Sequence, residues 1–186
     1  MTHPCNRLLL IGGLLAATGL AGTGAFAQVK TGFATYSNDK HGFSLTYPTG
    51  QFLGFPAATA DGFQAVSKDG KARLLVGTLA NYDAKSLGDY RTFILNESYP
   101  GANVTYAPVR DTWFVVSGVM NDGVTGFYQR VNFVCAGRNI NSWTVIYPFG
   151  EKPVYSPIIE QVHKDYRLGD GNCGKMTAPQ PVKGTK

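Results

Sequence analysis

Apolar and polar residues alternate along much of the chain between residues 41 and 147, and this period of two is typical of half-buried β-strands. The clearest case is Phe43–Tyr47, which Pro48 ends. Asp69-Gly70 separates two such runs, 63–67 and 72–79, and predicts a β-hairpin. Further strands are predicted over 52–55, 104–109, 113–120, 126–135 and 142–147.

The segment 113–120 is apolar at both parities of the strand. Trp113, Val115 and Val119 share one face, and Phe114, Val116 and Met120 share the other. A strand of this kind must be covered on both sides. Because short turns join the last four predicted strands, we expect them to form an antiparallel meander. The pattern predicts an α+β fold, a single antiparallel sheet of about six to seven strands flanked by two helices, one on each face.

Two segments have the spacing of amphipathic helices. In the first, Ser86 is the expected N-cap with Asp89 three residues later, and Pro100-Gly101 marks the end. Its apolar positions are Leu87, Tyr90, Phe93 and Ile94. In the second, Ser156 is the expected cap and Pro157 lies in the first turn. Its apolar face is formed by Ile158, Ile159, Val162 and Tyr166.

The first 27 residues have the pattern of a secretory signal peptide. Arg7 precedes the apolar run Leu8–Leu20, and the small-residue stretch ends at Ala25-Phe26-Ala27, so we expect a cut between Ala27 and Gln28. A retained anchor is the alternative, but the run is shorter than the roughly 20 residues that cross a bilayer. We therefore expect a periplasmic or secreted protein with no transmembrane anchor after cleavage.

Composition favours one globular domain. Hydrophobic residues make up 44% and aromatic residues 12% of the 186 residues, which argues against a disordered chain. We expect a flexible lead-in over 28–40, the domain over 41–174 and a disordered tail over 175–186. The formal net charge is +5, but the basic residues are scattered without a cluster, which argues against a nucleic-acid partner.

After cleavage, Cys135 and Cys173 are the remaining cysteines, and in an oxidising compartment they predict one disulfide. Free thiols or a redox pair are the alternatives, but a redox pair normally has the Cys-x-x-Cys spacing, which is absent. Cys135 shares its strand parity with Phe127 and Val131. We expect the second helix on that same face, because the chain must return to Cys135 after it.

Catalytic chemistry has little support in the residues. The mature chain has two histidines, His41 and His163, far apart, and a metal site needs three or four convergent ligands. Ser117 lies inside a predicted strand without a nucleophile elbow. We predict no catalytic residue, no metal and no cofactor. A carboxylate pair assembled by the fold stays open, since its separation is a three-dimensional property.

One row of polar side chains is the candidate binding patch. Tyr128, Arg130 and Asn132 alternate along the predicted strand 126–135 and share a face, where they present hydrogen-bonding groups. The alternative is that a helix covers this row or that it lies at an exposed sheet edge. Exposed aromatic residues near strand ends are a second candidate interface, with core packing as the alternative.

The octet His41-Gly42-Phe43-Ser44-Leu45-Thr46-Tyr47-Pro48 resembles the opening of PsbP/Mog1-like domains, in which a Gly-Phe strand ends in Tyr-Pro. The order of hairpin, helix, meander and last helix is similar as well. The resemblance implies an antiparallel sheet between helices and a binding or assembly role without a shared active site. The segment from Phe127-Tyr128 to Tyr147-Pro148 is also similar to small exported α-proteobacterial proteins of unassigned function.

The residues together favour an exported, non-enzymatic binding or assembly domain whose partner is a protein or an envelope component. A small lipid or ligand carrier and a hydrolase-like enzyme are the alternatives. A pocket lined by titratable groups with shifted pKa values would favour the enzyme. A deep apolar pocket without them would favour the carrier, and a flat aromatic patch would favour the binding domain.

Overall fold

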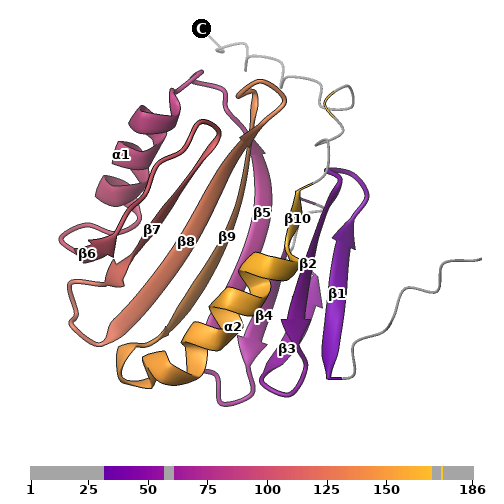
Figure 1. The fold of residues 1–186 in the computed structure, drawn as a ribbon, viewed down its shortest axis with the longest axis vertical. Coiled ribbons are helices and arrows are strands. Elements are labelled where there is room, and N and C mark those ends of the chain that lie inside the picture. The colour runs from indigo at the N-terminus through magenta and orange to yellow at the C-terminus, as the bar shows by residue number, and fades with distance from the viewer. Residues whose placement is uncertain (1–31, 57–60, 169–172, 174–186) are drawn as a thin grey trace, which may run out of the picture.

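The computed structural model of the chain describes residues 32–56, 61–168 and 173. Their strands form two antiparallel sheets, of seven and three strands (Figure 1). The elements are β1 (Phe33–Asn38), β2 (Phe43–Pro48), β3 (Phe52–Pro56), β4 (Gly62–Ser67), β5 (Arg73–Ala80), α1 (Leu87–Glu97), β6 (Asn103–Tyr106), β7 (Trp113–Val119), β8 (Thr125–Val134), β9 (Asn139–Pro148), the 3-10 helix η1 (Phe149–Glu151), α2 (Lys152–Asp165) and β10 (Arg167–Leu168).

The large sheet has the strand order β3-β4-β5-β9-β8-β7-β6. The hairpin predicted at Asp69-Gly70 is confirmed, since β4 pairs with β5 and Gly70 has a φ of 75°. The predicted meander is confirmed over β6 to β9. β5 connects the β3–β5 part of the sheet to the β6–β9 meander. It pairs with β9 along its length, from Arg73 opposite Ile146 to Ala80 opposite Asn139.

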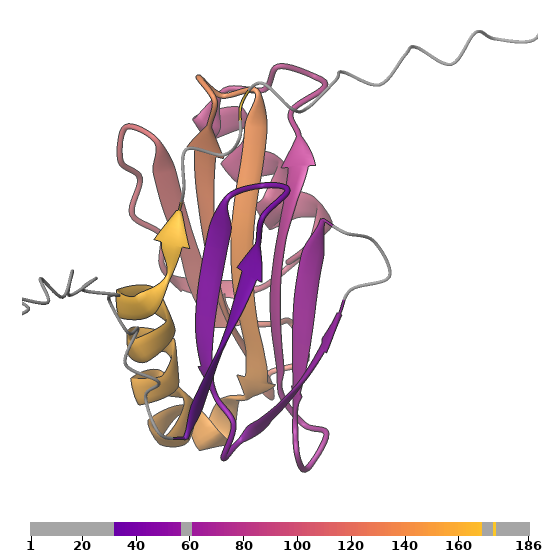
Figure 2. The same ribbon diagram turned by 90° about the vertical axis from the view of Figure 1, so that its right-hand side faces the viewer.

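The small sheet corrects the expectation of a single sheet. β2 pairs with β1 on one side and with β10 on the other, separately from the large sheet. Residues 33–38, which we expected within a flexible lead-in, form β1. The physical reason is the Tyr36 ring, which stacks on Phe63 of β4 with ring centroids 4.7 Å apart and so holds the strand against the large sheet. Figure 2 shows β1 and β2 from this side.

Two hydrophobic clusters lie on opposite faces of the large sheet. Register places Phe114 opposite Val131, and both belong to the cluster that α1 joins through Tyr90 and Ile94. The alternate residues form the other face, where Trp143 belongs to the same buried cluster as residues of α2. The residues of α2 in this second cluster are Tyr155, Ile158, Ile159 and Val162.

The strand β7 is buried on both faces, as its sequence predicts. Phe114 and Val116 are fully buried in the α1 cluster. Val115, which points to the other face, is 1% exposed. β7 therefore lies inside the sheet, between β8 and β6.

The start of α1 agrees with its sequence signal, and the start of α2 does not. The Ser86 side chain accepts a hydrogen bond from the Asp89 backbone N–H, as expected of an N-cap. Ser156 is not a cap, because α2 begins at Lys152 and Pro157 lies inside the helix. The extra turn buries Tyr155 on the same face as Ile158 and Ile159, and this packing outweighs the hydrogen bond that Pro157 cannot donate.

The predicted disulfide is confirmed, with the Cα atoms of Cys135 and Cys173 5.3 Å apart. The face inferred from Cys135 for the second helix is wrong, because α2 packs on the face of Trp143 and not on that of Phe127. Strand parity fails at Cys135, where the chain has left β8 and turns through the left-handed region, with φ values of 57° at Cys135 and 55° at Ala136.

Several sequence predictions lie outside the described residues. These are the signal peptide over 1–27, its cut between Ala27 and Gln28, and the tail over 175–186. In the part of the chain that the structure describes, no helix combines the length and the apolar character needed to span a bilayer.

Candidate functional site

The row of Tyr128, Arg130 and Asn132 lies on the α2 face of β8. Tyr128 is half-buried and stacks on Trp143 with ring centroids 5.2 Å apart, whereas Asn132 is buried at 3% exposure. Arg130 is half-buried between them. The row is therefore neither a free surface nor a fully covered layer, but is partly closed by the end of α2.

Cross-strand register brings further side chains around Arg130. Arg130 pairs with Val115 of β7 on one side and with Trp143 of β9 on the other, and Trp113 pairs with Asn132. The end of α2 adds His163 and the C-cap residue Tyr166. We call this group the Arg130 cluster; it comprises Trp113, Tyr128, Arg130, Asn132, Trp143, His163 and Tyr166.

The guanidinium of Arg130 is held by three contacts. Its central carbon lies 4.3 Å from the centroid of the Trp113 ring, within the range of a cation–π interaction. Its Nε donates to Asn132 Oδ1 at 3.1 Å, and its Nη1 lies 3.2 Å from Nε2 of His163. These contacts fix the position of the charged group without neutralising it.

The charge of Arg130 has no acidic counterpart among the described residues. None of the ion pairs between them includes Arg130, and the groups that act on its charge are Tyr128 and Tyr166. Burial lowers the pKa of Arg130 from its ordinary value. Burial, and then the charge of Arg130, lower the pKa of His163 below its usual range. His163 is therefore neutral at pH 7 and accepts the hydrogen bond from Arg130.

Polar atoms without a partner gather in the same cluster. Among the described residues, no hydrogen-bond partner is present for Asn132 Nδ2, Trp143 Nε1 or Tyr166 OH, although each atom is buried. An amide or indole N–H left in this way costs free energy unless something accepts its hydrogen bond. The cluster thus combines an unpaired cation with an excess of donors.

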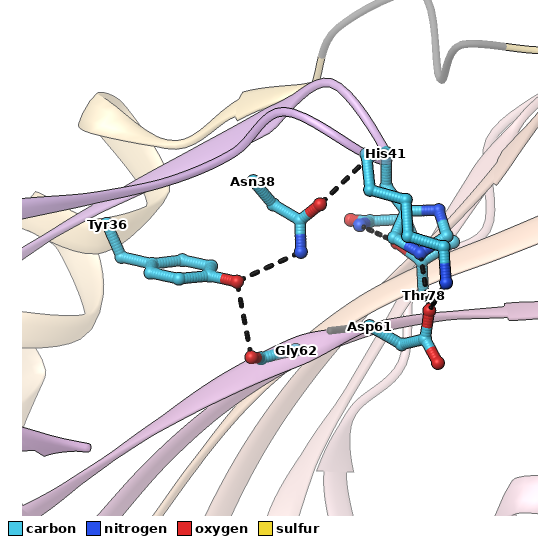
Figure 3. A network of polar contacts seen from close by, with 8 residues as sticks. Tyr36, Asn38, His41, Asp61, Gly62 and Thr78 are labelled. Atoms are coloured by element: carbon cyan, nitrogen blue, oxygen red, sulfur yellow. Dashed lines mark hydrogen bonds and ion pairs between the residues drawn. The ribbon is translucent and has the colours of Figure 1, made fainter. Parts of the chain in front are cut away.

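A second polar network joins the small sheet to the large one (Figure 3). Tyr36 OH donates to the carbonyl of Gly62 at 3.2 Å, and Asn38 Nδ2 donates to Tyr36 OH at 2.9 Å. His41, buried at 3% exposure, has its Nε2 2.7 Å from Oδ1 of Asp61. We interpret the network as structural. The bonds of Tyr36 to Gly62 and of His41 to Asp61 connect the β1–β2 hairpin to the start of β4, and the bond from Asn38 holds Tyr36 in position.

The carboxylate of Asp61 is the charged centre of this network. Hydrogen bonds from Lys40 and then from His41 lower the pKa of Asp61 from 3.8 to about 2. The Lys40 ammonium lies 2.5 Å from Asp61 Oδ1. His41, which the sequence offered as a possible metal ligand, thus contributes to the contact between the two sheets, which we call the seam. It lies apart from His163.

No protein-family model matches the chain, and no curated protein matches it. Among solved structures, cyanobacterial PsbP (CyanoP) from Synechocystis sp. PCC 6803 is similar with a TM-score of 0.56 and 15% identity, over 78% of this chain and 98% of that one. This chain has a PsbP-like fold. PA94 from Pseudomonas aeruginosa, a protein of unknown function, is similar with a TM-score of 0.41 and 13% identity, over 81% of this chain and 99% of that one.

The PsbP-like fold bears out the resemblance noted in the octet from His41 to Pro48. At 15% identity the likeness extends to the fold and carries no residue roles. The Arg130 cluster is therefore argued from this chain alone.

Described residues line two grooves on the surface of this PsbP-like domain. One, of about 480 Å³, lies between α2 and the end of the β1–β2 hairpin that is opposite its turn, beside the β2–β3 turn, and none of its lining residues is titratable. It is lined by Gly32, Phe33, Pro48, Gly50, Gln51, Val154, Pro157, Ile158 and Gln161. The other, of about 420 Å³, lies at the start of α1 beside Cys135 and includes Lys85 and Asp111.

In the described part of the chain, no group of three or more His, Cys, Asp or Glu residues is placed so that it could hold a metal ion. Ser117 is half-buried on β7 opposite Tyr128. The two described histidines belong to different groups, His41 to the seam and His163 to the Arg130 cluster.

The sequence predicts the row of Tyr128, Arg130 and Asn132 but not the residues that surround it in the Arg130 cluster. The pattern predicts Trp113 and Trp143 as strand residues but not as neighbours of Arg130; the β7–β8 register places Trp113 opposite Asn132. The sequence does not predict that His163 lies beside Arg130, because it favours the other face of the sheet for the second helix. With α2 placed on the face of Trp143, the same pattern puts His163 and Tyr166 near the row of Tyr128, Arg130 and Asn132.

Proposed function

We propose that this chain is a non-enzymatic binding or assembly domain that works in the periplasm or after secretion, and that it holds a protein or envelope component at the Arg130 cluster. The observation that carries the proposal is a half-buried Arg130 with no carboxylate partner in the described residues. A charge that is partly desolvated and has no counter-charge nearby carries a free-energy cost, and a bound partner that supplies the opposite charge reduces that cost.

Export is supported by two features. The leader ending at Ala27 has the signal-peptide pattern. The Cys135–Cys173 bond is of the kind that persists in oxidising compartments and is rare in the cytosol. Both fit a domain that meets its partner in the cell envelope.

The carrier is the second candidate function, and the groove of about 480 Å³ beside α2 favours it. Its apolar walls include Phe33, Val154 and Ile158, and ligand pockets of several hundred Å³ lined by such residues bind apolar molecules. The binding domain remains our first proposal, because the groove offers no group that explains the unpaired charge of Arg130.

Chemical cross-linking in periplasmic extract tests the proposal with one matched pair of variants. Arg130→Gln removes the charge from the cluster, and Arg73→Gln makes the same change at an exposed position on the other face of the large sheet. We expect a partner that the wild-type chain and Arg73→Gln recover and that Arg130→Gln loses. Recovery of the same partners by all three chains would contradict the proposal.

A further inference from the structure

We infer that the Arg130 cluster is a carboxylate-binding site, which receives an acidic side chain or a C-terminal carboxylate of the bound protein. The inference rests on the proposed function and adds the chemistry of the ligand. Three observations support it: the free edge of the guanidinium, the excess of donors around it, and the single net charge of the site.

The first observation concerns the hydrogens of Arg130. A guanidinium carries five N–H donors. Asn132 Oδ1 accepts from Nε, and His163 lies beside Nη1, so the Nη1–Nη2 edge keeps free donors, and Nη2 has no partner among the described residues. Two parallel N–H groups on one edge match the two oxygens of a carboxylate, which is the usual bidentate arrangement.

The second observation concerns two buried N–H donors in the cluster. Trp143 is fully buried, and its indole Nε1 is a donor that nothing accepts among the described residues. The Nδ2 of Asn132, which is 3% exposed, is a second such donor. A site with donors to spare and a cation at its centre selects a ligand that only accepts, as an ionised carboxylate does.

The third observation concerns charge. At pH 7 His163 is neutral, so Arg130 supplies the single positive charge of the cluster, and one carboxylate balances it. A phosphate group carries more negative charge and is usually met by several cations. Arg110 is the other cation beside Trp113, at 5.9 Å from the ring centroid, and it already donates to the carbonyl of Val109. A carboxylate therefore fits the cluster better than a phosphate.

The test is an NMR titration of the ¹⁵N-labelled chain in which sodium acetate replaces sodium chloride at constant ionic strength. We expect saturable shifts of the Arg130 Nε–H and Trp143 Nε1–H signals, and a rise of the pKa of His163 because a negative charge then lies beside it. In Arg130→Gln the affinity for acetate should fall roughly tenfold or more, whereas Arg73→Gln should bind as the wild type does.

Absence of saturable shifts in the wild-type chain would overturn the inference, and so would equal affinity in Arg130→Gln. Inorganic phosphate that binds these same signals more tightly than acetate would overturn the choice of a carboxylate. The wild-type titration decides even if Arg130→Gln does not fold. Acetate binding at Arg130 together with unchanged partner capture by Arg130→Gln would instead reject the proposed function and leave the carboxylate site standing.

Discussion

Single residues in this domain obtain their properties from neighbours that are distant in sequence. Arg130 is packed on Trp113, 17 positions earlier in the numbering, and it meets His163 from another element. The sequence pattern predicts that Tyr128, Arg130 and Asn132 share a face, because strand parity is local. The pattern does not predict that Arg130 lacks an acidic partner among the described residues, because that absence depends on every element that packs around it.

Asp61 gives a prediction at the residue scale. Its pKa is lowered from 3.8 to about 2 in the folded chain, so its stabilising contribution is present above pH 3.8 and is lost as the pH falls toward 2. Asp61→Asn should therefore be less stable than the wild type at pH 6, and the difference should shrink as the pH approaches 2. Urea unfolding of both chains across this range measures it. A difference that stays constant with pH would show that the charge of Asp61 has no such role.

At the scale of elements, periodicity and turn chemistry predict the strands better than the starts of helices. The β4–β5 hairpin and the β6–β9 meander follow from Asp69-Gly70 and from short turns, which are local signals. The start of α2 at Lys152 depends on the burial of Tyr155, a tertiary effect that also tolerates Pro157 inside the helix. β1 was missed for a similar reason, since the stacking of Tyr36 on Phe63 joins distant segments.

Gly118 gives a prediction for the pairing of β6 with β7. A Cβ at Gly118 would lie 2.1 Å from the backbone oxygen of Asn103, so β6 would have to move away. Gly118→Ala should lower the free energy of unfolding by about 1–3 kcal/mol, as overpacking does. Urea unfolding measures this change, and hydrogen exchange of the β6 amides should increase. Gly150→Ala is the control, because a Cβ there meets nothing within 4 Å. Equal stability of the two variants would refute the close approach.

At the scale of the whole molecule, the composition and the octet from His41 to Pro48 predict the class and the PsbP-like fold. The hydrophobic pattern does not predict the division into two sheets, because the alternation in β2 is typical of a half-buried strand in either sheet. β2 pairs with β1 on one edge and, on the other edge, with the two residues of β10, which lie opposite Phe43 and Ser44. A two-residue strand has no sequence signature.

The disulfide gives a prediction for global stability. Cys135 and Cys173 are 38 residues apart, and closing a loop of that length stabilises by about 4 kcal/mol in the chain-entropy model. Cys173→Ala should lower the melting temperature and the free energy of unfolding, while acetate binding at Arg130 should persist, since neither cysteine belongs to the Arg130 cluster. Calorimetry and the acetate titration check the two parts. Two reactive thiols in the native wild-type chain would exclude the bond.

The most direct test of the central claim, that the Arg130 cluster binds an acidic group, is the melting temperature in acetate compared with chloride at equal ionic strength. A ligand that binds only the folded state raises its stability by RT ln(1 + L/Kd), where L is the free ligand concentration. The account predicts that acetate raises the melting temperature of the wild-type chain and of Arg73→Gln, and leaves Arg130→Gln unchanged. Equal increases in all three chains, or none in the wild type, would contradict it.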